Sequence, residues 1–401
     1  MSKRNELVDF WRGFVLVAIF VNHVPGNLLE QLTPRNFGFS DSAEAFIFLA
    51  GLSVALVYYP RVPAGDLLGV LSRCARRAFD LYRVHLILTF AAVALSALAY
   101  VASEHAELIE AHGRGTVFHD TAQGVAGIVL LGHQLGYFNI LPLYVVLMLW
   151  APVVLVLARV HVLAALGVAV ALYGAARLAG LALPSWPEPG VWYFNPFAWQ
   201  LLFTVGVVCG VLFGAERPAR SDRLVRLSWA VVALGALVVT EGFGLLSGLR
   251  DWVFARFDLT KGDLGILRLL HFLALAYLVA TLRLGAGVAE TRVGAELRRL
   301  GRNGLAVFAV GSLLSALGQT VVALAAVRES ASPQLLGMLF TLAGLAALVA
   351  LGHYLEWNRS GRASGAGSRS RRSSSPSPLP RPIPIAASAN ASSRRRTAFS
   401  G

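Results

Sequence analysis

Ten long apolar runs constrain the fold of this chain more than any other feature of its sequence. A bilayer core about 30 Å thick is crossed by about 20 residues of α-helix, and each run is close to that length. The 401 residues are 56% hydrophobic and 14% charged, which gives more apolar surface than one soluble core needs. We predict an all-α polytopic membrane protein with a bundle of about ten transmembrane helices. The predicted spans cover residues 9–24, 43–59, 84–102, 138–158, 161–183, 197–215, 228–247, 264–284, 304–328 and 335–355.

The distribution of Lys and Arg predicts the orientation of these helices. With the N-terminus in the cytoplasm, and with Arg177 and Arg283 counted with the segments that follow their spans, 26 of the 35 Lys and Arg fall in cytoplasmic segments and seven in segments on the opposite side. The other two, Arg12 and Arg268, lie within spans. An excess of positive charge in cytoplasmic loops is typical of membrane proteins. We therefore predict that both termini are cytoplasmic. The net charge of +13 follows this topology, so it does not indicate binding to nucleic acid.

The sequence divides into an integral-membrane domain, residues 1–356, and a C-terminal tail, residues 357–401. The tail is basic and rich in Ser, Pro and Arg, and we predict that it is disordered because it cannot bury a core. Two readings of it stay open, attraction to the anionic lipids of the cytoplasmic leaflet and a solvated extension without function. The apolar segment 124–137 is too short to cross a bilayer alone, and we expect it to be interfacial or re-entrant.

The first predicted span carries two polar residues, Arg12 and His23, that a simple membrane anchor would not contain. An interval of eleven residues is three helical turns plus about 20°, so the two side chains share one helix face about 16 Å apart along its axis. Ionisable groups are costly inside a bilayer and are therefore functional candidates. Imidazole titrates near neutral pH, which suits His23 to acid–base chemistry. We predict that Arg12 and His23 form the catalytic pair.

Other polar groups fall near the predicted outer ends of further spans. The ionisable ones are Glu44, Glu241, Arg268 and His271, and the uncharged ones are Asn139, Asn195, Trp199 and Gln200. Because these residues come from several helices at similar depth, we predict a polar chamber in the outer half of the bundle that includes His23. In this chamber Glu44 and Glu241 are supporting residues, and Arg268, His271, Asn195, Trp199 and Gln200 are candidates for binding substrate. The other seven His residues are given no role.

Several of these residues also have purely structural explanations. Asp9 is three residues before Arg12, a spacing typical of an ion pair, so Asp9 is expected to orient Arg12. Asp41 and Glu44 have the spacing of a capping box, in which Glu44 would bond only to the backbone.

Glu241 fits a buried acid that bonds to a neighbouring helix, and Arg268 and His271 fit interfacial residues whose side chains reach the headgroups. The two Cys residues, Cys74 and Cys209, are not placed to form a disulfide, and no spacing typical of a metal site is present. We predict no metal and no tightly bound cofactor.

Arg12 and His23 match the R-x10-H motif of the acyltransferase-3 superfamily of multipass membrane enzymes. Further blocks surround these two residues, namely DFWRG at 9–13, NHVPGN at 22–27, RNFGFSD at 35–41, AEAFIFLAG at 43–51, LPLY at 141–144, WPEPG at 186–190, FNPFAWQ at 194–200 and RLLHF at 268–272. Over roughly residues 5–355 these blocks resemble more closely the OpgC branch of that superfamily, the succinyltransferases of osmoregulated periplasmic glucans.

The resemblance implies a bacterial inner-membrane enzyme that moves an acyl group, succinyl in this branch, from cytoplasmic acyl-CoA to a hydroxyl of a periplasmic glucan. His23 would then act as general base on the sugar hydroxyl or carry the acyl group as an acyl-imidazole. Arg12 would hold an anionic part of the donor, and Arg268 would pair with the succinyl carboxylate or stabilise the oxyanion.

Two other classes of protein remain possible from the sequence. A multipass transporter or flippase for a saccharide or anion would also carry charges within its spans, but we find no convincing inverted repeat. A non-catalytic partner of glucan synthesis would keep a sugar-binding chamber yet would not need Arg12 and His23 to be aligned. The sequence does not indicate the oligomeric state.

Overall fold

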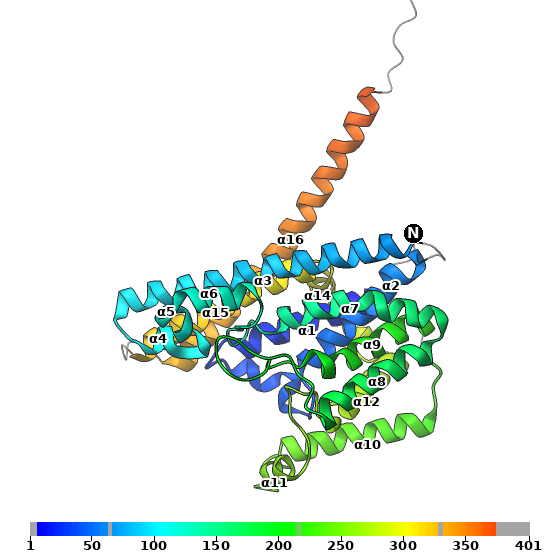
Figure 1. Ribbon diagram of the computed structural model, residues 1–401, viewed down its shortest axis with the longest axis horizontal. Coiled ribbons are helices and arrows are strands. Elements are labelled where there is room, and N and C mark those ends of the chain that lie inside the picture. The colour runs from blue at the N-terminus through cyan, green and yellow to red at the C-terminus, as the bar shows by residue number, and fades with distance from the viewer. Residues whose placement is uncertain (1–5, 63–65, 215, 217, 328–331, 374–401) are drawn as a thin grey trace, which may run out of the picture. The chain divides into compact units, whose positions relative to one another are not determined.

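The structure is a computed structural model that describes residues 6–62, 66–214, 216, 218–327 and 332–373 (Figure 1). These residues form helices and loops with no β-strand, and the one isolated bridge that they contain joins Pro184 and Val191. The all-α prediction is therefore confirmed. The chain divides into two compact units, residues 1–355 and 356–401.

Most of the described residues lie in sixteen α-helices. They are α1 (Glu6–His23), α2 (Ser42–Tyr58), α3 (Leu67–Ser103), α4 (Glu107–Glu110), α5 (Gly115–His119), α6 (Thr121–Val129), α7 (Ile140–Val160), α8 (Val162–Leu178), α9 (Pro196–Phe213), α10 (Asp222–Val239), α11 (Leu249–Arg256), α12 (Ile266–Leu282), α13 (Ala286–Ala289), α14 (Arg292–Arg302), α15 (Gly304–Val327) and α16 (Pro333–Ser373). Short 3-10 turns are η1 (Leu28–Leu32), η2 (Pro34–Asn36), η3 (Tyr59–Arg61) and η4 (Ala111–Gly113).

Six described helices are long and apolar enough to cross a membrane: α2, α3, α7, α9, α15 and α16. Two more, α8 and α12, are apolar but have 17 residues each. The remaining two predicted spans correspond to α1 and α10, each of which carries three charged residues. Every predicted span thus coincides with a helix, while the count of ten spans and the orientation of the termini stay predictions.

Glycines let two pairs of helices approach to backbone contact. On α2 and α9, Gly51 and Gly206 lie where a Cβ would overlap the backbone of the facing helix. On α1 and α14, Gly13 and Gly301 do the same. Small residues at helix crossings are typical of membrane bundles, where close packing replaces hydrophobic burial as the driving force. These crossings fix α1 and α2, the helices that carry the candidate site.

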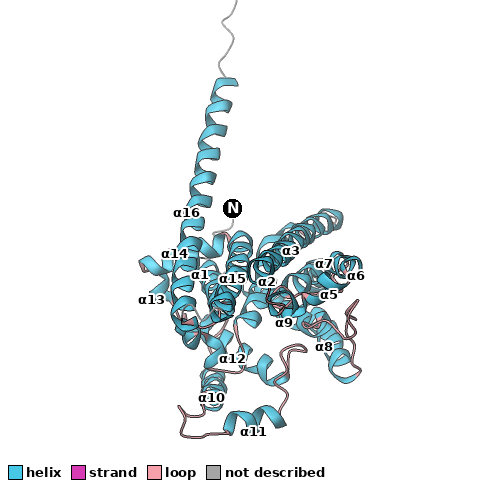
Figure 2. Ribbon diagram, turned by 90° about the vertical axis from the view of Figure 1, so that its left-hand side faces the viewer, coloured by secondary structure: helices cyan, strands magenta, loops and turns pink. Residues whose placement is uncertain are grey.

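The other helices of the first unit surround this centre, as Figures 1 and 2 show. The 37-residue α3 packs along α7 and α15, and α10 lies at the opposite edge against α12. The predicted interfacial segment 124–137 consists of the last part of the short α6, which ends at Val129, and the loop that follows it.

The second unit begins at Glu356, and its described part is the end of α16, which is helical to Ser373. The helix therefore extends beyond residue 357, where we placed the start of a disordered tail. Residues 374–401 of that tail lie outside the described residues.

Candidate active site

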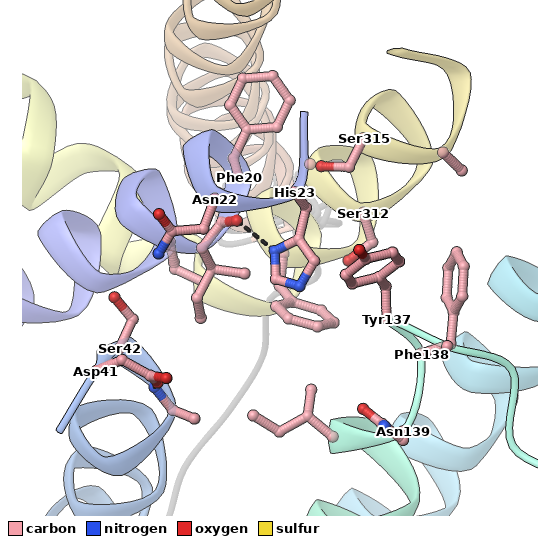
Figure 3. Close-up of a pocket in the computed structure, with 18 of the residues that line it drawn as sticks. Phe20, Asn22, His23, Asp41, Ser42, Tyr137, Phe138, Asn139, Ser312 and Ser315 are labelled. Atoms are coloured by element: carbon pink, nitrogen blue, oxygen red, sulfur yellow. Dashed lines mark hydrogen bonds between the residues drawn. The ribbon is translucent and has the colours of Figure 1, made fainter. Parts of the chain in front are cut away.

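A cavity of about 460 Å³ lies at the C-terminal end of α1, and we call it the His23 cavity. Helices α1, α2 and α15 line it together with loop residues near Tyr137 and Tyr193. Figure 3 shows the His23 ring projecting into this space, with Tyr137, Asn139 and Asp41 around it. His23 is the last residue of α1, so the end of the helix presents its side chain to the cavity.

Hydrogen bonding determines which His23 nitrogen is available. Nδ1 lies 2.5 Å from the carbonyl oxygen of Ile19, one turn earlier on α1. A carbonyl can only accept, so Nδ1 carries the proton, and in the neutral ring Nε2 is left with a free lone pair. Gln319 on α15 donates to the His23 carbonyl at 2.8 Å and ties the end of α1 to α15. The neutral imidazole is thus held as a base.

Tyr137 covers one side of the His23 ring. Their ring centroids are 4.8 Å apart in an edge-to-face arrangement. The backbone of Tyr137 has a φ of 71°, which is unusual for a bulky residue. Strained conformations of this kind persist where the surroundings impose them, often at functional sites.

Two cations and one carboxylate also line the His23 cavity. Lys261 Nζ lies 2.6 Å from Asp41 Oδ2, and Arg35 pairs with Glu30 at 2.8 Å. Burial acts to raise the pKa of Asp41, but Lys261 and Arg268 together hold it below the ordinary value. Asp41 is therefore an anion that keeps Lys261 in place.

Arg268 lies behind this cluster and does not line the cavity. Its Nε donates to Glu44 Oε1 at 2.7 Å, and its Nη2 lies 2.6 Å from the same oxygen and 3.2 Å from Asp41 Oδ2. Glu44 is fully buried, and its other oxygen accepts the Asp41 N–H at 2.8 Å. The capping box is therefore present, with an ion pair added to it. Both carboxylates engage Arg268, which does not line the His23 cavity and so is not placed to meet a ligand there.

His271 and Glu241 also lie away from the His23 cavity. His271 Nδ1 is 2.8 Å from Ser40 Oγ, and its ring fills the space beside Gly38 and Gly235. Glu241 Oε1 accepts the Gly248 N–H at 2.7 Å and so closes a turn after α10. The predicted single polar chamber is thus divided, because these two side chains hold neighbouring segments together.

The three polar residues that open α9 serve a positioning role. Asn195 Nδ2 donates to Asp263 at 2.9 Å, and Trp199 Nε1 donates to the Lys261 and Gly262 carbonyls at 3.1 and 2.9 Å. Gln200 Nε2 donates to the Ala169 carbonyl on α8 at 2.7 Å. Asn195 and Trp199 therefore hold the loop that delivers Lys261 to the cavity, although none of the three residues lines it.

A second cavity, of about 490 Å³, lies at the other end of α1, and we call it the Arg12 cavity. Arg12 Nη1 donates to Asp9 Oδ1 at 3.0 Å and to the Gly301 carbonyl at 3.3 Å, and Nη2 donates to Ser53 Oγ. The expected Asp9–Arg12 ion pair is therefore present. Leu16 lines both cavities, so the predicted Arg12–His23 axis runs from one cavity to the other.

Sequence reasoning missed three residues that line the His23 cavity, namely Arg35, Lys261 and Tyr137. Arg35 was within reach, because it opens the RNFGFSD block that carries part of the resemblance. Lys261 and Tyr137 lie in loops where the sequence gives no periodic signal. Among the described residues, no group of three or more His, Cys, Asp or Glu could hold a metal ion.

The comparison with protein families shows to which family the chain belongs. The family described as OpgC protein matches residues 4–360, which include both cavities and every candidate site residue. The chain belongs to the OpgC family. The resemblance drawn from the sequence blocks is thereby confirmed. No curated protein and no solved structure matches the chain, so the site of this OpgC-family protein is interpreted from its own geometry.

Proposed function

We propose that this protein is a membrane O-acyltransferase that modifies periplasmic glucans. Membership of the OpgC family and the apolar helices support a membrane protein that acts in glucan modification. The observation that carries the acyl-transfer step is the hydrogen bond from His23 Nδ1 to the Ile19 carbonyl, which leaves Nε2 of the neutral ring free beside a cavity. Arg12 lies toward the other end of the same helix, at the second cavity. The proposed donor is acyl-CoA, with succinyl-CoA the expected form, and it acts as a co-substrate.

His23 Nε2 removes the proton from a glucan hydroxyl while the hydroxyl oxygen attacks the thioester carbonyl. A C–O bond forms, the C–S bond breaks, and the proton passes from His23 to the departing CoA thiolate. In the second route Nε2 itself attacks the thioester carbonyl, the C–S bond breaks and CoA leaves as the thiolate. A glucan hydroxyl then attacks the acyl-imidazole, the C–N bond to His23 breaks, and the hydroxyl proton passes to the CoA thiolate. Both routes need the neutral ring, so activity falls as the pH drops through the pKa of His23.

Arg35 and Lys261 are proposed to pair with the succinyl carboxylate, the role that we first expected of Arg268. Both line the His23 cavity, and a succinyl carboxylate placed there would meet two cations. Arg12 positions the donor from the opposite cavity, on the cytoplasmic side in the predicted orientation. The enzyme would reside in the bacterial inner membrane with both termini in the cytoplasm. Its proposed partners are therefore acyl-CoA, a periplasmic glucan and the lipid bilayer.

One observation also favours a transporter or flippase for a saccharide or anion. Two cavities that lie at opposite ends of α1 and share wall residues resemble the two access sites of such a protein. Transport would not require a proton acceptor at His23, so a His23→Gln variant separates the two proposals. An enzyme should lose about 100-fold or more in rate, whereas a transporter should keep its activity.

The test compares acyl substituents on periplasmic glucans by mass spectrometry in a deletion strain. The strain is complemented with wild type, with His23→Ala or with His161→Ala, which changes an exposed His that lines neither cavity. We expect wild type and His161→Ala to restore acylation and His23→Ala to fail at equal protein level. Acylated glucan from His23→Ala would remove His23 from the mechanism. Unchanged glucans in the deletion strain would remove the proposed acceptor.

A further inference from the structure

The Arg12 cavity contains more positive charge than the R-x10-H motif supplies. Three arginines from three helices line it: Arg12 on α1, Arg77 on α3 and Arg302 at the end of α14. Its lining, among the described residues, includes no Asp or Glu. Arg12 is paired with Asp9, which lies outside the lining, so the charged side chains that line the cavity are all guanidinium groups.

Two of the arginines are followed, one turn later on the same helix, by apolar residues that also line the cavity. Leu16 comes one turn after Arg12, and Leu81 comes one turn after Arg77, a rise of about 6 Å in each case. Beyond them α3 reaches His85, beside Phe138 in the wall of the His23 cavity. The wall of the Arg12 cavity therefore runs along α1 and α3 from the arginines toward the His23 cavity.

Apart from the three arginines, the lining of the cavity is uncharged. It is formed by Phe46, Leu49, Ala50, Leu141 and Met148, with the hydroxyl groups of Ser53, Tyr58 and Tyr144. A free inorganic anion would contact only the arginines and would leave the uncharged part of the cavity unfilled. The arrangement fits a longer molecule that has an anionic head and an uncharged tail.

Guanidinium groups bind phosphate in a bidentate manner, and several of them around one cavity are typical of sites for polyphosphates. The first turn of α15, Gly304 to Ala306, also lines the cavity, and the positive end of its helix dipole adds to this field. Phosphate oxygens spread over two or more groups would engage Arg77 and Arg302 together with Arg12.

We propose that Arg77 and Arg302 bind the phosphate groups of a phosphorylated ligand whose uncharged tail extends toward Leu16. This inference rests on the proposed function, in which the ligand is the coenzyme A part of the donor. It assigns a nucleotide phosphate site that the R-x10-H motif alone does not include. A phospholipid headgroup has the same chemistry and is the other source that the test must separate.

The experiment measures binding of coenzyme A, without an acyl group, to the purified full-length protein in phosphatidylcholine nanodiscs. Arg77→Gln and Arg302→Gln should each raise the Kd about tenfold or more, since each removes a charge-assisted contact. Arg76→Gln is the matched control, because Arg76 is an exposed neighbour on α3 that does not line the cavity. Pantetheine, which has no phosphate, should bind weakly and equally to all four proteins. Equal unfolding temperatures show that the variants are folded, and Arg77→Lys should retain part of the affinity.

The inference is overturned if Arg77→Gln and Arg302→Gln bind coenzyme A as Arg76→Gln does. It is also overturned if pantetheine binds as tightly as coenzyme A. If phosphatidylglycerol added to the nanodiscs displaces coenzyme A only from proteins that keep Arg77, the site is specific for phosphate but its ligand is lipid, which rejects the donor assignment. Failure of the proposed function is distinguishable, because His23→Ala should lose glucan acylation yet bind coenzyme A with the wild-type Kd.

Discussion

Leu16 on α1 and Phe308 on α15 line both the His23 cavity and the Arg12 cavity. Both side chains are almost fully buried, with 3% and 5% of their surface exposed. On α15, Gly304 precedes Phe308 by four residues and Gly311 follows it by three, so small residues flank the ring on one helix face. Two apolar side chains thus separate the cavity of the candidate base from the cavity of the arginines.

Enlarging Phe308 should block the reaction without weakening donor binding. The proposed transfer requires the acyl end of the donor to pass between Leu16 and Phe308, and the larger ring of Phe308→Trp would fill that space. We expect at least a tenfold fall in kcat, measured as acyl transfer in reconstituted protein, and an unchanged Kd for coenzyme A. Leu313→Trp is the control, because Leu313 is exposed on the same helix and lines neither cavity. Equal rates for both variants would contradict the passage.

Replacing Arg12 with Lys should impair the donor side of the reaction although the charge is kept. The Arg12 guanidinium contacts Asp9, Ser53 and the Gly301 carbonyl at once, and an ammonium group cannot reproduce this planar geometry. We expect KM for the acyl donor to rise about tenfold or more while KM for the glucan acceptor stays constant. A rise in the acceptor KM instead would indicate that Arg12 acts in binding the glucan acceptor and would contradict its assignment to the donor.

Removing Arg268 should destabilise the protein more than it affects the chemistry. Arg268→Gln leaves Glu44 buried without its charge partner, a change that costs about 3–5 kcal/mol where a buried ion pair is broken from one side. The measurement is the free energy of unfolding in detergent. The control is Arg220→Gln, which breaks the exposed pair with Asp222 and should cost less than about 1 kcal/mol. Similar losses for both variants would contradict the structural role.

The sequence predicted the helices well and the grouping of polar residues only in part. Arg12, Asp9 and His23 lie on one helix, so the helical period alone gave their arrangement. Depth in the membrane placed Arg268 and Glu241 at the level of His23, but depth does not specify the direction of a side chain. Arg268 instead donates to the Glu44 carboxylate outside the cavity, and Glu241 accepts a backbone N–H within a turn. Lys261 reaches the cavity only because α9 holds its loop, a long-range contact without local signal.

The stabilising effect of Asp41 should depend on pH in one direction. Its pKa in the folded protein lies below the ordinary value of 3.8, because Lys261 and Arg268 oppose the effect of burial. The stabilisation is therefore complete above about pH 5 and is lost as the pH falls through and below that ordinary value. We expect the difference in unfolding temperature between wild type and Asp41→Asn to be constant from about pH 5 to 8 and to narrow at lower pH. A difference in unfolding temperature that grows as the pH falls would contradict the lowered pKa of Asp41.

Lys261 should determine which acyl groups are transferred. Its ammonium group lines the His23 cavity beside Asp41, where the free carboxylate of a succinyl group would lie during attack on the thioester. An acetyl group has no such carboxylate and gains nothing from the cation. Lys261→Met keeps the apolar stem but removes the charge, so kcat/KM for a succinyl donor should fall about tenfold or more relative to that for an acetyl donor. Competition between the two donors in one assay, with the products quantified by mass spectrometry, measures the ratio of the two kcat/KM values directly. An equal loss for both donors would show that Lys261 holds Asp41 and the loop rather than the acyl group.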